Sequence, residues 1–139
     1  MNDEDMRSLF SRIQTIAIIG AKDKPGPVDR VGRYLIEAGY TVFPVHPVRK
    51  EVWGLPAVPT LAEVPGRIDL IDVFRAPEYC LAHAEETVAL AQRPLLFWLQ
   101  LGITNEEAMA VVQAAGIRAV QDACLMVDHK RLFPFGMKR

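Results

Sequence analysis

The sequence predicts one α/β domain over residues 1–139, built on a doubly wound, five-stranded and mainly parallel sheet flanked by helices. Two observations carry this prediction. Short apolar runs alternate along the chain with segments of helical periodicity, as in successive βαβ units. The first run, residues 15–19, ends abruptly at Gly20 and is followed by a turn-rich loop and a helix. We expect the Rossmann-like strand order 3-2-1-4-5.

The five expected strands are apolar runs rich in β-branched and aromatic residues, as strands covered on both faces require. They comprise residues 15–19, 40–45, 68–74, 95–99 and 117–120. Between the second and third strands, residues 47–65 are rich in proline and turn-forming residues. We expect a short strand and one helical turn there, because Trp53 and Leu61 need burial.

The expected helices begin and end at residues that favour helix termini. They comprise an N-terminal helix within residues 1–13, then 28–38, 77–92 and a helix from Thr104 or Asn105 to Gly116. The first of them is amphipathic and either covers the sheet or serves a dimer. After Asp122 we expect a turn or short helix, and then a basic tail over residues 133–139.

Composition excludes several classes of function. The formal net charge is −1, so no general attraction to nucleic acid or to an anionic membrane is expected. The apolar runs are shorter than a membrane span, and residues 1–12 lack the apolar core of a signal peptide. Cys80 and Cys124 lie far apart without a metal-binding pattern. We expect a cytoplasmic protein with two reduced structural thiols and no metal.

The segment after the first strand predicts a phosphate site. The helix that follows Gly20 directs unpaired backbone N–H groups at an anion above that glycine, and Lys22 and Lys24 lie in the connecting loop. An NAD fingerprint requires G-x-G-x-x-G and an acid after the second strand, where this chain has Val45-His46-Pro47. Gly32 is the candidate for close packing of helix and strand. A phosphate-rich ligand without the dinucleotide ribose contact is favoured.

Ligands of open α/β sheets bind beyond the carboxyl ends of the strands. The candidate binding residues there are Gly20, Ala21, Lys22, Lys24, Arg30, Val45, His46, Pro47, Lys50, Phe74, Arg75, Gln100 and Gly102. Nucleophile–base and carboxylate pairs are not evident, so we expect no catalytic residue.

Several candidates have a structural alternative. Lys22 and Lys24 contact phosphate or are solvated; Arg30 contacts phosphate or pairs with Asp23 or Asp29. His46 is a catalytic base or, as we favour, a packed loop histidine that hydrogen-bonds the backbone.

Four further side chains have a structural reading beside a functional one. They are Phe74, Arg75, Cys124 and His129. Phe74 is a core residue or the wall of a pocket, and Arg75 serves a ligand or an interface. We expect Cys124 to be unreactive and His129, beside Lys130 and Arg131, to lie on the surface.

Four segments together resemble the small CoA-binding-domain proteins, which are related to the CoA-binding domain of the succinyl-CoA synthetase alpha subunit. These segments are Thr15–Lys22, Gly39–Pro47, Asp69–Arg75 and Trp98–Gly102, and the resemblance runs in order from about Thr15 to Leu132. Two positions depart from the family pattern. The family's second strand usually ends Val-Asn-Pro, where this chain has His46, and Ala21 stands where a small hydroxyl residue is frequent.

The resemblance implies a Rossmann-like fold that binds coenzyme A or an acyl-CoA. It places the pyrophosphate over the Gly20 loop and the adenine end near Val45-His46-Pro47. Lys22, Lys24, Arg30 and Lys50 are then the candidate phosphate ligands, and Phe74 and Arg75 line the adjacent strand end. The synthetases' phosphorylated histidine belongs to a region outside the resemblance, so ligase chemistry is not carried over.

Three hypotheses follow. The favoured one is a CoA-binding carrier, sensor or regulatory protein without catalysis of its own. The alternatives are an NAD(P)-binding oxidoreductase-like protein, with Arg49 and Lys50 for a 2′-phosphate, and an interaction module that has lost its ligand. A small-molecule CoA ligand is the expected partner, and a homodimer or a protein partner stays open.

Overall fold

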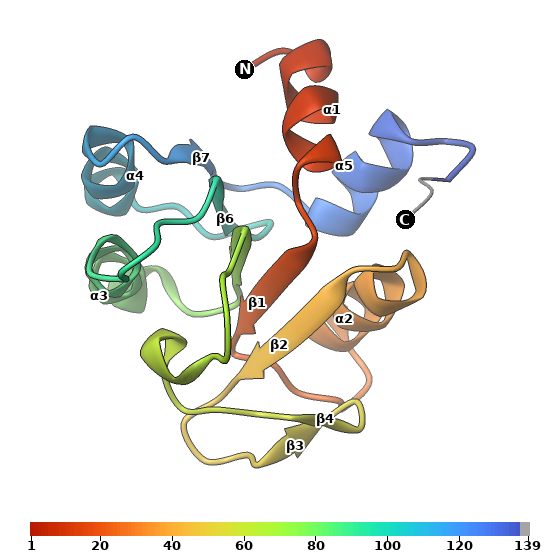
Figure 1. The fold of residues 1–139 in the computed structure, drawn as a ribbon, viewed down its shortest axis with the longest axis vertical. Coiled ribbons are helices and arrows are strands. Elements are labelled where there is room, and N and C mark those ends of the chain that lie inside the picture. Colours follow the sequence, from red (N-terminus) through yellow and green to blue (C-terminus); the bar gives the residue numbers. More distant parts are fainter. Residues whose placement is uncertain (137–139) are drawn as a thin grey trace.

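A five-stranded parallel sheet lies between two layers of helices in the computed structural model, which describes residues 1–136 (Figure 1). The strands of the sheet are β1 (Thr15–Ile19), β2 (Thr41–Val45), β5 (Leu70–Val73), β6 (Leu96–Leu99) and β7 (Arg118–Val120). All pairings within it are parallel. The predicted fold class and all five strands are therefore confirmed.

The strand order differs from the expected one. The sheet reads β2-β1-β5-β6-β7, which is 2-1-3-4-5 for the five strands counted along the chain, so the order 3-2-1-4-5 was wrong. Val58 holds the place beyond β2, through a single parallel bridge to Val45. Pro59 follows directly and has no amide to donate, so no ladder develops there. The third Rossmann strand is thus reduced to one residue at the outer side of β2. The next full strand, β5, pairs with β1 on the side away from β2.

Five helices cover the sheet. They are α1 (Asp3–Ser11), α2 (Pro27–Glu37), α3 (Pro77–Val88), α4 (Glu106–Ala114) and α5 (Leu125–Leu132). Figure 1 shows α1, α2 and α5 on one side of the sheet and α3 and α4 on the other. The side chains of Asn2 and Asn105 cap α1 and α4 by accepting from Asp5 N and Ala108 N. The expected tail over residues 133–139 ends outside the described residues.

The segment between β2 and β5 contains a small hairpin and one helical turn. Its strands β3 (Glu51–Val52) and β4 (Leu55–Pro56) pair antiparallel, and the 3₁₀ helix η1 spans Leu61–Glu63. Trp53, in the hairpin turn, packs against α2: a Cβ on Gly32 would lie 2.1 Å from Trp53 Cη2. The lack of a side chain at Gly32 therefore makes room for the indole of Trp53. The sequence had suggested that it lets the helix pack closely on a strand.

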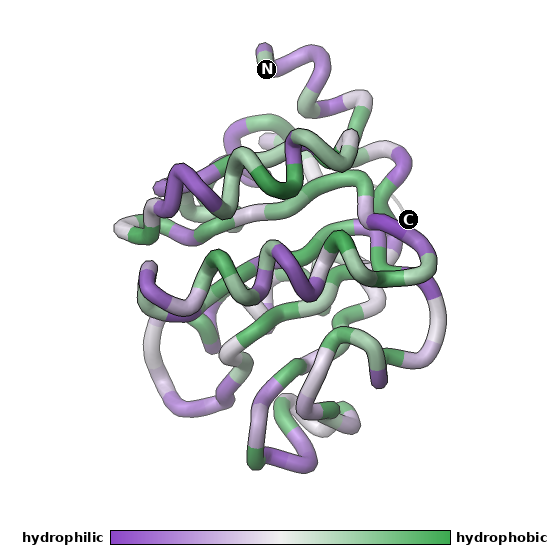
Figure 2. Tube along the Cα trace, turned by 90° about the vertical axis from the view of Figure 1, so that its left-hand side faces the viewer, coloured by the Kyte–Doolittle hydropathy of each residue, from purple (hydrophilic) through white to green (hydrophobic). Residues whose placement is uncertain are grey.

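Apolar side chains alternate between the two faces of the sheet. Ile16 and Ile18 of β1 face the layer of α1, α2 and α5, and Ala17 and Ile19 face α3 and α4. Figure 2 shows the strands as green, hydrophobic paths between helices that alternate between green and purple. This packing on both faces gives the strand ends, and the loops that follow them, a rigid base.

Asp72 is a carboxyl group inside this core. It lies in β5 between Ile18 and Trp98 on the neighbouring strands, and it is wholly buried. Neither carboxylate oxygen has a hydrogen-bond partner within residues 1–136. Burial without a partner disfavours the charged form, so the pKa of Asp72 is raised well above its usual value.

His129 is buried, so its predicted surface position was wrong. Its Nδ1 and Nε2 lie 2.6 and 2.8 Å from the hydroxyls of Tyr34 and Tyr40. The charged neighbours Lys130 and Arg131 suggested exposure, but in a helix the spacing of Leu125, His129 and Leu132 places these three on one face. That face packs on the core and fixes α5 against α2.

Within residues 1–136, no helix has the length and apolar character needed to span a membrane.

Candidate functional site

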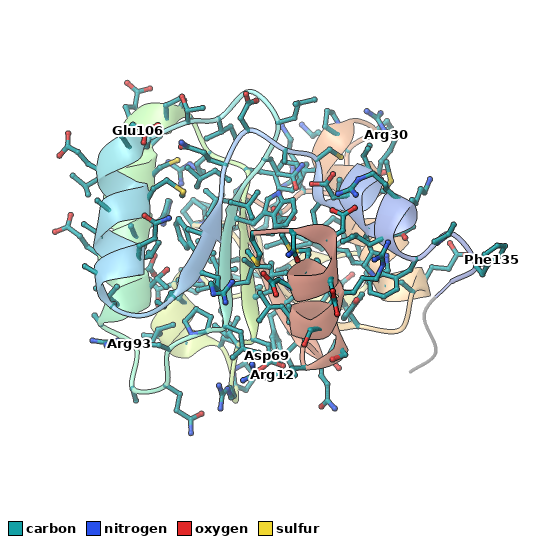
Figure 3. The ribbon with its side chains drawn as sticks, turned by 90° about the horizontal axis from the view of Figure 1, so that it is seen from above. Arg12, Arg30, Asp69, Arg93, Glu106 and Phe135 are labelled. Atoms are coloured by element: carbon teal, nitrogen blue, oxygen red, sulfur yellow. The ribbon has the colours of Figure 1, made fainter. Side chains whose placement is uncertain are left out.

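A cavity of about 740 Å³ lies at the carboxyl ends of four neighbouring strands. Gly20 follows β1, His46 follows β2, Phe74 follows β5 and Gln100 follows β6, and all four residues line it. Figure 3 shows Arg30 and Glu106, in the first turns of α2 and α4, at the opposite end of the molecule from Arg12 and Asp69. The cavity is thus at the edge where ligands of open α/β sheets bind.

Eight of the thirteen candidate binding residues line this cavity. They are Gly20, Lys22, Arg30, His46, Pro47, Phe74, Arg75 and Gln100. The other five are not part of its wall: Ala21, Lys24, Val45, Lys50 and Gly102. Ala21 and Val45 are buried beneath the loops, and Lys24, Lys50 and Gly102 are exposed outside the cavity.

The rest of the wall comes from residues that the sequence reasoning missed. They are Pro27, Val28, Val31, Ala76, Leu101, Ile103, Cys124 and Met126. The first turns of α2 and the loop after β6 could have been included, because their elements were predicted. Cys124 and Met126 could not, since their place depends on how α5 returns to the sheet.

Gly20 allows the loop after β1 to lie close to the end of the neighbouring strand, β5. Its φ is +84°, and a Cβ there would lie 2.3 Å from the carbonyl oxygen of Phe74. The Gly20 and Ala21 amides both donate to Val45 O, at 2.9 and 3.3 Å. Only glycine fits this position without strain. The loop then leads to α2, whose first turn lines the cavity and presents backbone amides to an anion.

Three cations, Lys22, Arg30 and Arg75, line the cavity. The carboxylates proposed as alternatives for Arg30 have other partners: Asp29 pairs with Arg33 and Asp23 with Arg49. Within residues 1–136, none of the three cations forms an ion pair. This leaves their charges available to an anionic ligand.

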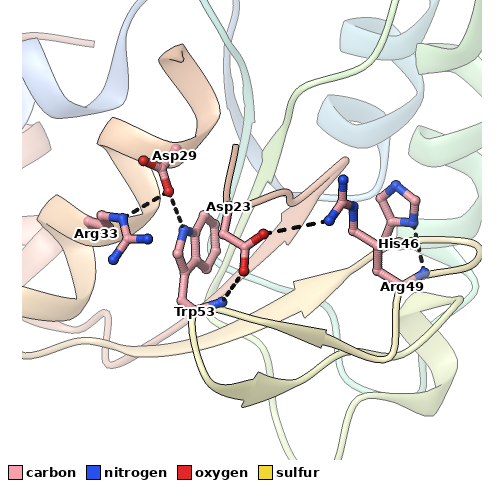
Figure 4. A network of polar contacts seen from close by, with 6 residues as sticks. All are labelled: Asp23, Asp29, Arg33, His46, Arg49 and Trp53. Carbon is pink, nitrogen blue, oxygen red and sulfur yellow. Dashed lines mark hydrogen bonds and ion pairs between the residues drawn. The ribbon is translucent and has the colours of Figure 1, made fainter. Parts of the chain in front are cut away.

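A polar network ties the loop between β1 and α2, and the first turn of α2, to the β3–β4 hairpin (Figure 4). Asp23 accepts from Trp53 N at 3.3 Å and pairs with Arg49 at 3.5 Å. Asp29 of α2 accepts from Trp53 Nε1 and Arg33 Nε, each at 2.9 Å. The Trp53 hydrogen bond is the largest cause of the lowered pKa of Asp29. Arg49 thus pairs with Asp23 in the absence of a ligand, and its role for a 2′-phosphate stays an alternative.

His46 makes the backbone contacts that the sequence favoured for it. Its Nδ1 accepts from Val48 N and Arg49 N, both at 3.1 Å, which confirms a packed loop histidine. Partial burial lowers the pKa of His46, and the positive charges of Arg49, Arg75 and Lys22 lower it further. The imidazole is therefore kept neutral at the edge of the cavity.

Other residues of the wall are apolar, and one of them carries a thiol. Leu101, Ile103, Met126 and Cys124 lie there, at the loop after β6 and the start of α5. Gln100 accepts from Leu125 N at 3.2 Å, and Trp98 Nε1 donates to Ala123 O at 2.8 Å. These two bonds fasten the start of α5 to the end of β6, so the apolar wall is held in place.

Within residues 1–136, His, Cys, Asp and Glu side chains form no group of three or more that could hold a metal ion. What the cavity offers instead is a set of cations at the start of α2 and in the loops after β1 and β5, together with apolar side chains.

The fold and the cavity define this protein as a Rossmann-like α/β domain with a cleft at the switch point of its sheet. The chain belongs to the CoA binding domain family, whose model matches residues 14–130. It is 34% identical over 126 residues to the YneT protein of Bacillus subtilis, covering 90% of this chain and 92% of YneT.

Two solved structures are also similar. A Thermus thermophilus protein shares 46% identity with a TM-score of 0.89, covering 96% of this chain and all of that one. A Pyrococcus horikoshii protein shares 33% identity with a TM-score of 0.90, covering 96% of this chain and 93% of that one.

Proposed function

We propose that this protein binds coenzyme A or an acyl-CoA in the cavity at the strand ends. The pyrophosphate lies over the Gly20 loop and the first turn of α2, beside Lys22 and Arg30. The adenine end lies near His46 and Pro47. The pantetheine arm runs along the apolar wall towards Cys124.

The observation that carries this proposal is that one cavity is lined both by three cations, Lys22, Arg30 and Arg75, and by apolar side chains from the loop after β6 and the start of α5. Phosphates need amides and cations, and a long uncharged arm needs an apolar wall; CoA contains both parts in one molecule. Membership of the CoA binding domain family supports the same ligand. Phe74 and Gln100 also line the cavity, at the ends of β5 and β6.

The protein then acts as a carrier, sensor or regulatory partner for the CoA ligand. Lys24 and Lys50, which lie outside the cavity, are not ligand residues in this proposal. The departure at Ala21 removes no contact either, because that side chain is buried beneath the loop.

Protection of Cys124 from alkylation tests this proposal. Acetyl-CoA is the suitable probe because it has no free thiol to consume iodoacetamide. At about ten times its Kd it should slow the alkylation of Cys124 about tenfold, since the rate follows the unoccupied fraction. ADP lacks the arm and should protect Cys124 much less. Peptide mapping by mass spectrometry measures both rates.

Cys80 is the internal control, because it is buried in α3 and its pKa is raised by that burial. Its slow alkylation should be the same with and without ligand. Equal alkylation of Cys124 in the presence and absence of acetyl-CoA would contradict the proposed course of the arm.

A further inference from the structure

His46 stands where the family pattern has asparagine, and its hydrogen bonds explain how a histidine can serve there. Two backbone amides, Val48 N and Arg49 N, converge on its Nδ1 (Figure 4). A ring nitrogen that accepts two N–H groups carries no proton. The neutral imidazole therefore has its hydrogen on Nε2, on the other edge of the ring.

Charged groups from three loops favour this neutral form. Lys22 follows β1, Arg49 lies in the loop of His46 itself, and Arg75 follows β5. All three are cations, and they disfavour a second proton on the imidazole. Protonation at Nδ1 would also break both bonds to the backbone. His46 is thus a hydrogen-bond donor through Nε2 and an acceptor through Nδ1.

An asparagine offers the same two functions. Its amide oxygen accepts from backbone amides two or three residues on, as in Asx turns, and its amide nitrogen donates outward. In His46 the Nδ1 replaces the oxygen and the Nε2 replaces the nitrogen. Histidine in place of asparagine therefore keeps the backbone turn through Nδ1. It also keeps a hydrogen-bond donor, Nε2, which lies further from the backbone than an asparagine amide nitrogen.

We propose that His46 contacts the ligand by donating its Nε2–H to a phosphate oxygen, while the two bonds at Nδ1 fix the ring. His46 lines the cavity together with Lys22 and Arg75, so a phosphate is the acceptor that suits all three donors. This rests on the proposed function. In CoA the phosphate is either the pyrophosphate or the 3′-phosphate.

The first measurement determines the tautomer of the His46 ring in the ligand-free protein. Nitrogen-15 NMR should show the proton of His46 on Nε2 and an unprotonated Nδ1. A proton on Nδ1 would overturn the proposal whatever the protein binds.

Affinities for CoA and dephospho-CoA then test the contact in His46→Asn, His46→Asp and His46→Ala. Asparagine should retain the wild-type affinity, because it keeps both the acceptor and the donor. Aspartate keeps only the acceptor and alanine keeps neither. Both should bind about tenfold more weakly, as expected for the loss of a charge-assisted hydrogen bond.

The two ligands identify the phosphate. If His46→Ala binds both CoA and dephospho-CoA more weakly, the contact is with the pyrophosphate. If it binds only CoA more weakly, the contact is with the 3′-phosphate. Wild-type affinity in the alanine variant, or equal weakening in the asparagine and alanine variants, would overturn the proposal and leave CoA binding intact. A wild-type protein that binds neither ligand would instead overturn the proposed function.

Discussion

Gly20→Ala is expected to destabilise the fold by about 3 kcal/mol, at the upper end of the cost of strained backbone. The new Cβ would lie 2.3 Å from Phe74 O, at a residue whose φ is +84°. Either the loop or the end of β5 must move, and both line the cavity. CoA binding should weaken together with stability. Urea unfolding and a CoA titration measure the two effects.

Gly54→Ala is the matched control. Gly54 has a φ of +73°, but a Cβ there meets nothing within 4 Å. This substitution should cost only the left-handed backbone, about 1 kcal/mol, and leave CoA binding unchanged. Similar losses of stability for the two variants would show that the close approach of Gly20 to Phe74 does not constrain the loop.

Asp72→Asn is expected to stabilise the protein by roughly 1–3 kcal/mol near pH 8, because the folded carboxyl group keeps a proton that the unfolded chain releases. Asp72 is wholly buried and its carboxylate has no partner within residues 1–136. Asparagine has a similar shape and never ionises. Urea unfolding of both proteins from about pH 4 to pH 8 measures the difference.

The direction in which stability changes with pH follows from the raised pKa of Asp72 in the folded state. Below the ordinary pKa of 3.8 both states hold the proton, so the side chain costs nothing by ionisation. As the pH rises above that value, the unfolded chain releases the proton and the folded one keeps it. The free energy of unfolding then falls with rising pH, until the folded pKa is passed. The advantage of asparagine should therefore grow with pH.

Asp69→Asn is the control on the same segment. Asp69 accepts from Gln14 N and Thr15 N and lies 3.4 Å from Arg67 Nε, so its charge has partners. Asp69→Asn should therefore destabilise the protein. An advantage of Asp72→Asn that stays constant between pH 4 and pH 8 would contradict the burial of a neutral carboxyl group.

The fold was predictable because its local signals agree with its packing. Residues 15–19 are β-branched or small and apolar, and they form β1 with the bounds that their composition predicts. The strand order was not predictable in the same way, because it depends on a competition between segments. Val58 makes only one bridge beside β2, and Pro59 ends it, so β2 remains the edge strand, while β5 pairs with β1 on its other side.

The site was predictable where it depends on strand ends and less so elsewhere. Gly20, His46, Phe74 and Gln100 follow four successive strands of the sheet, so their meeting at one edge is a consequence of parallel pairing. Lys24 and Lys50 lie outside the cavity wall, and their contact with a ligand stays a prediction, because charge in a loop does not fix the direction of a side chain. The surface position predicted for His129 was wrong, and the place of Cys124 in the cavity wall was not foreseen, because the docking of α5 depends on distant residues, among them Gln100 and Tyr40.

Isothermal titration calorimetry of the purified protein with CoA tests the central claim most directly. We expect saturable binding of one CoA per chain, tighter than that of ADP because the apolar wall adds contacts with the pantetheine arm. NADPH should bind more weakly than CoA, since the loop after β1 lacks the G-x-G-x-x-G fingerprint of dinucleotide sites. The absence of saturable heat with CoA, or tighter binding of NADPH, would contradict the account.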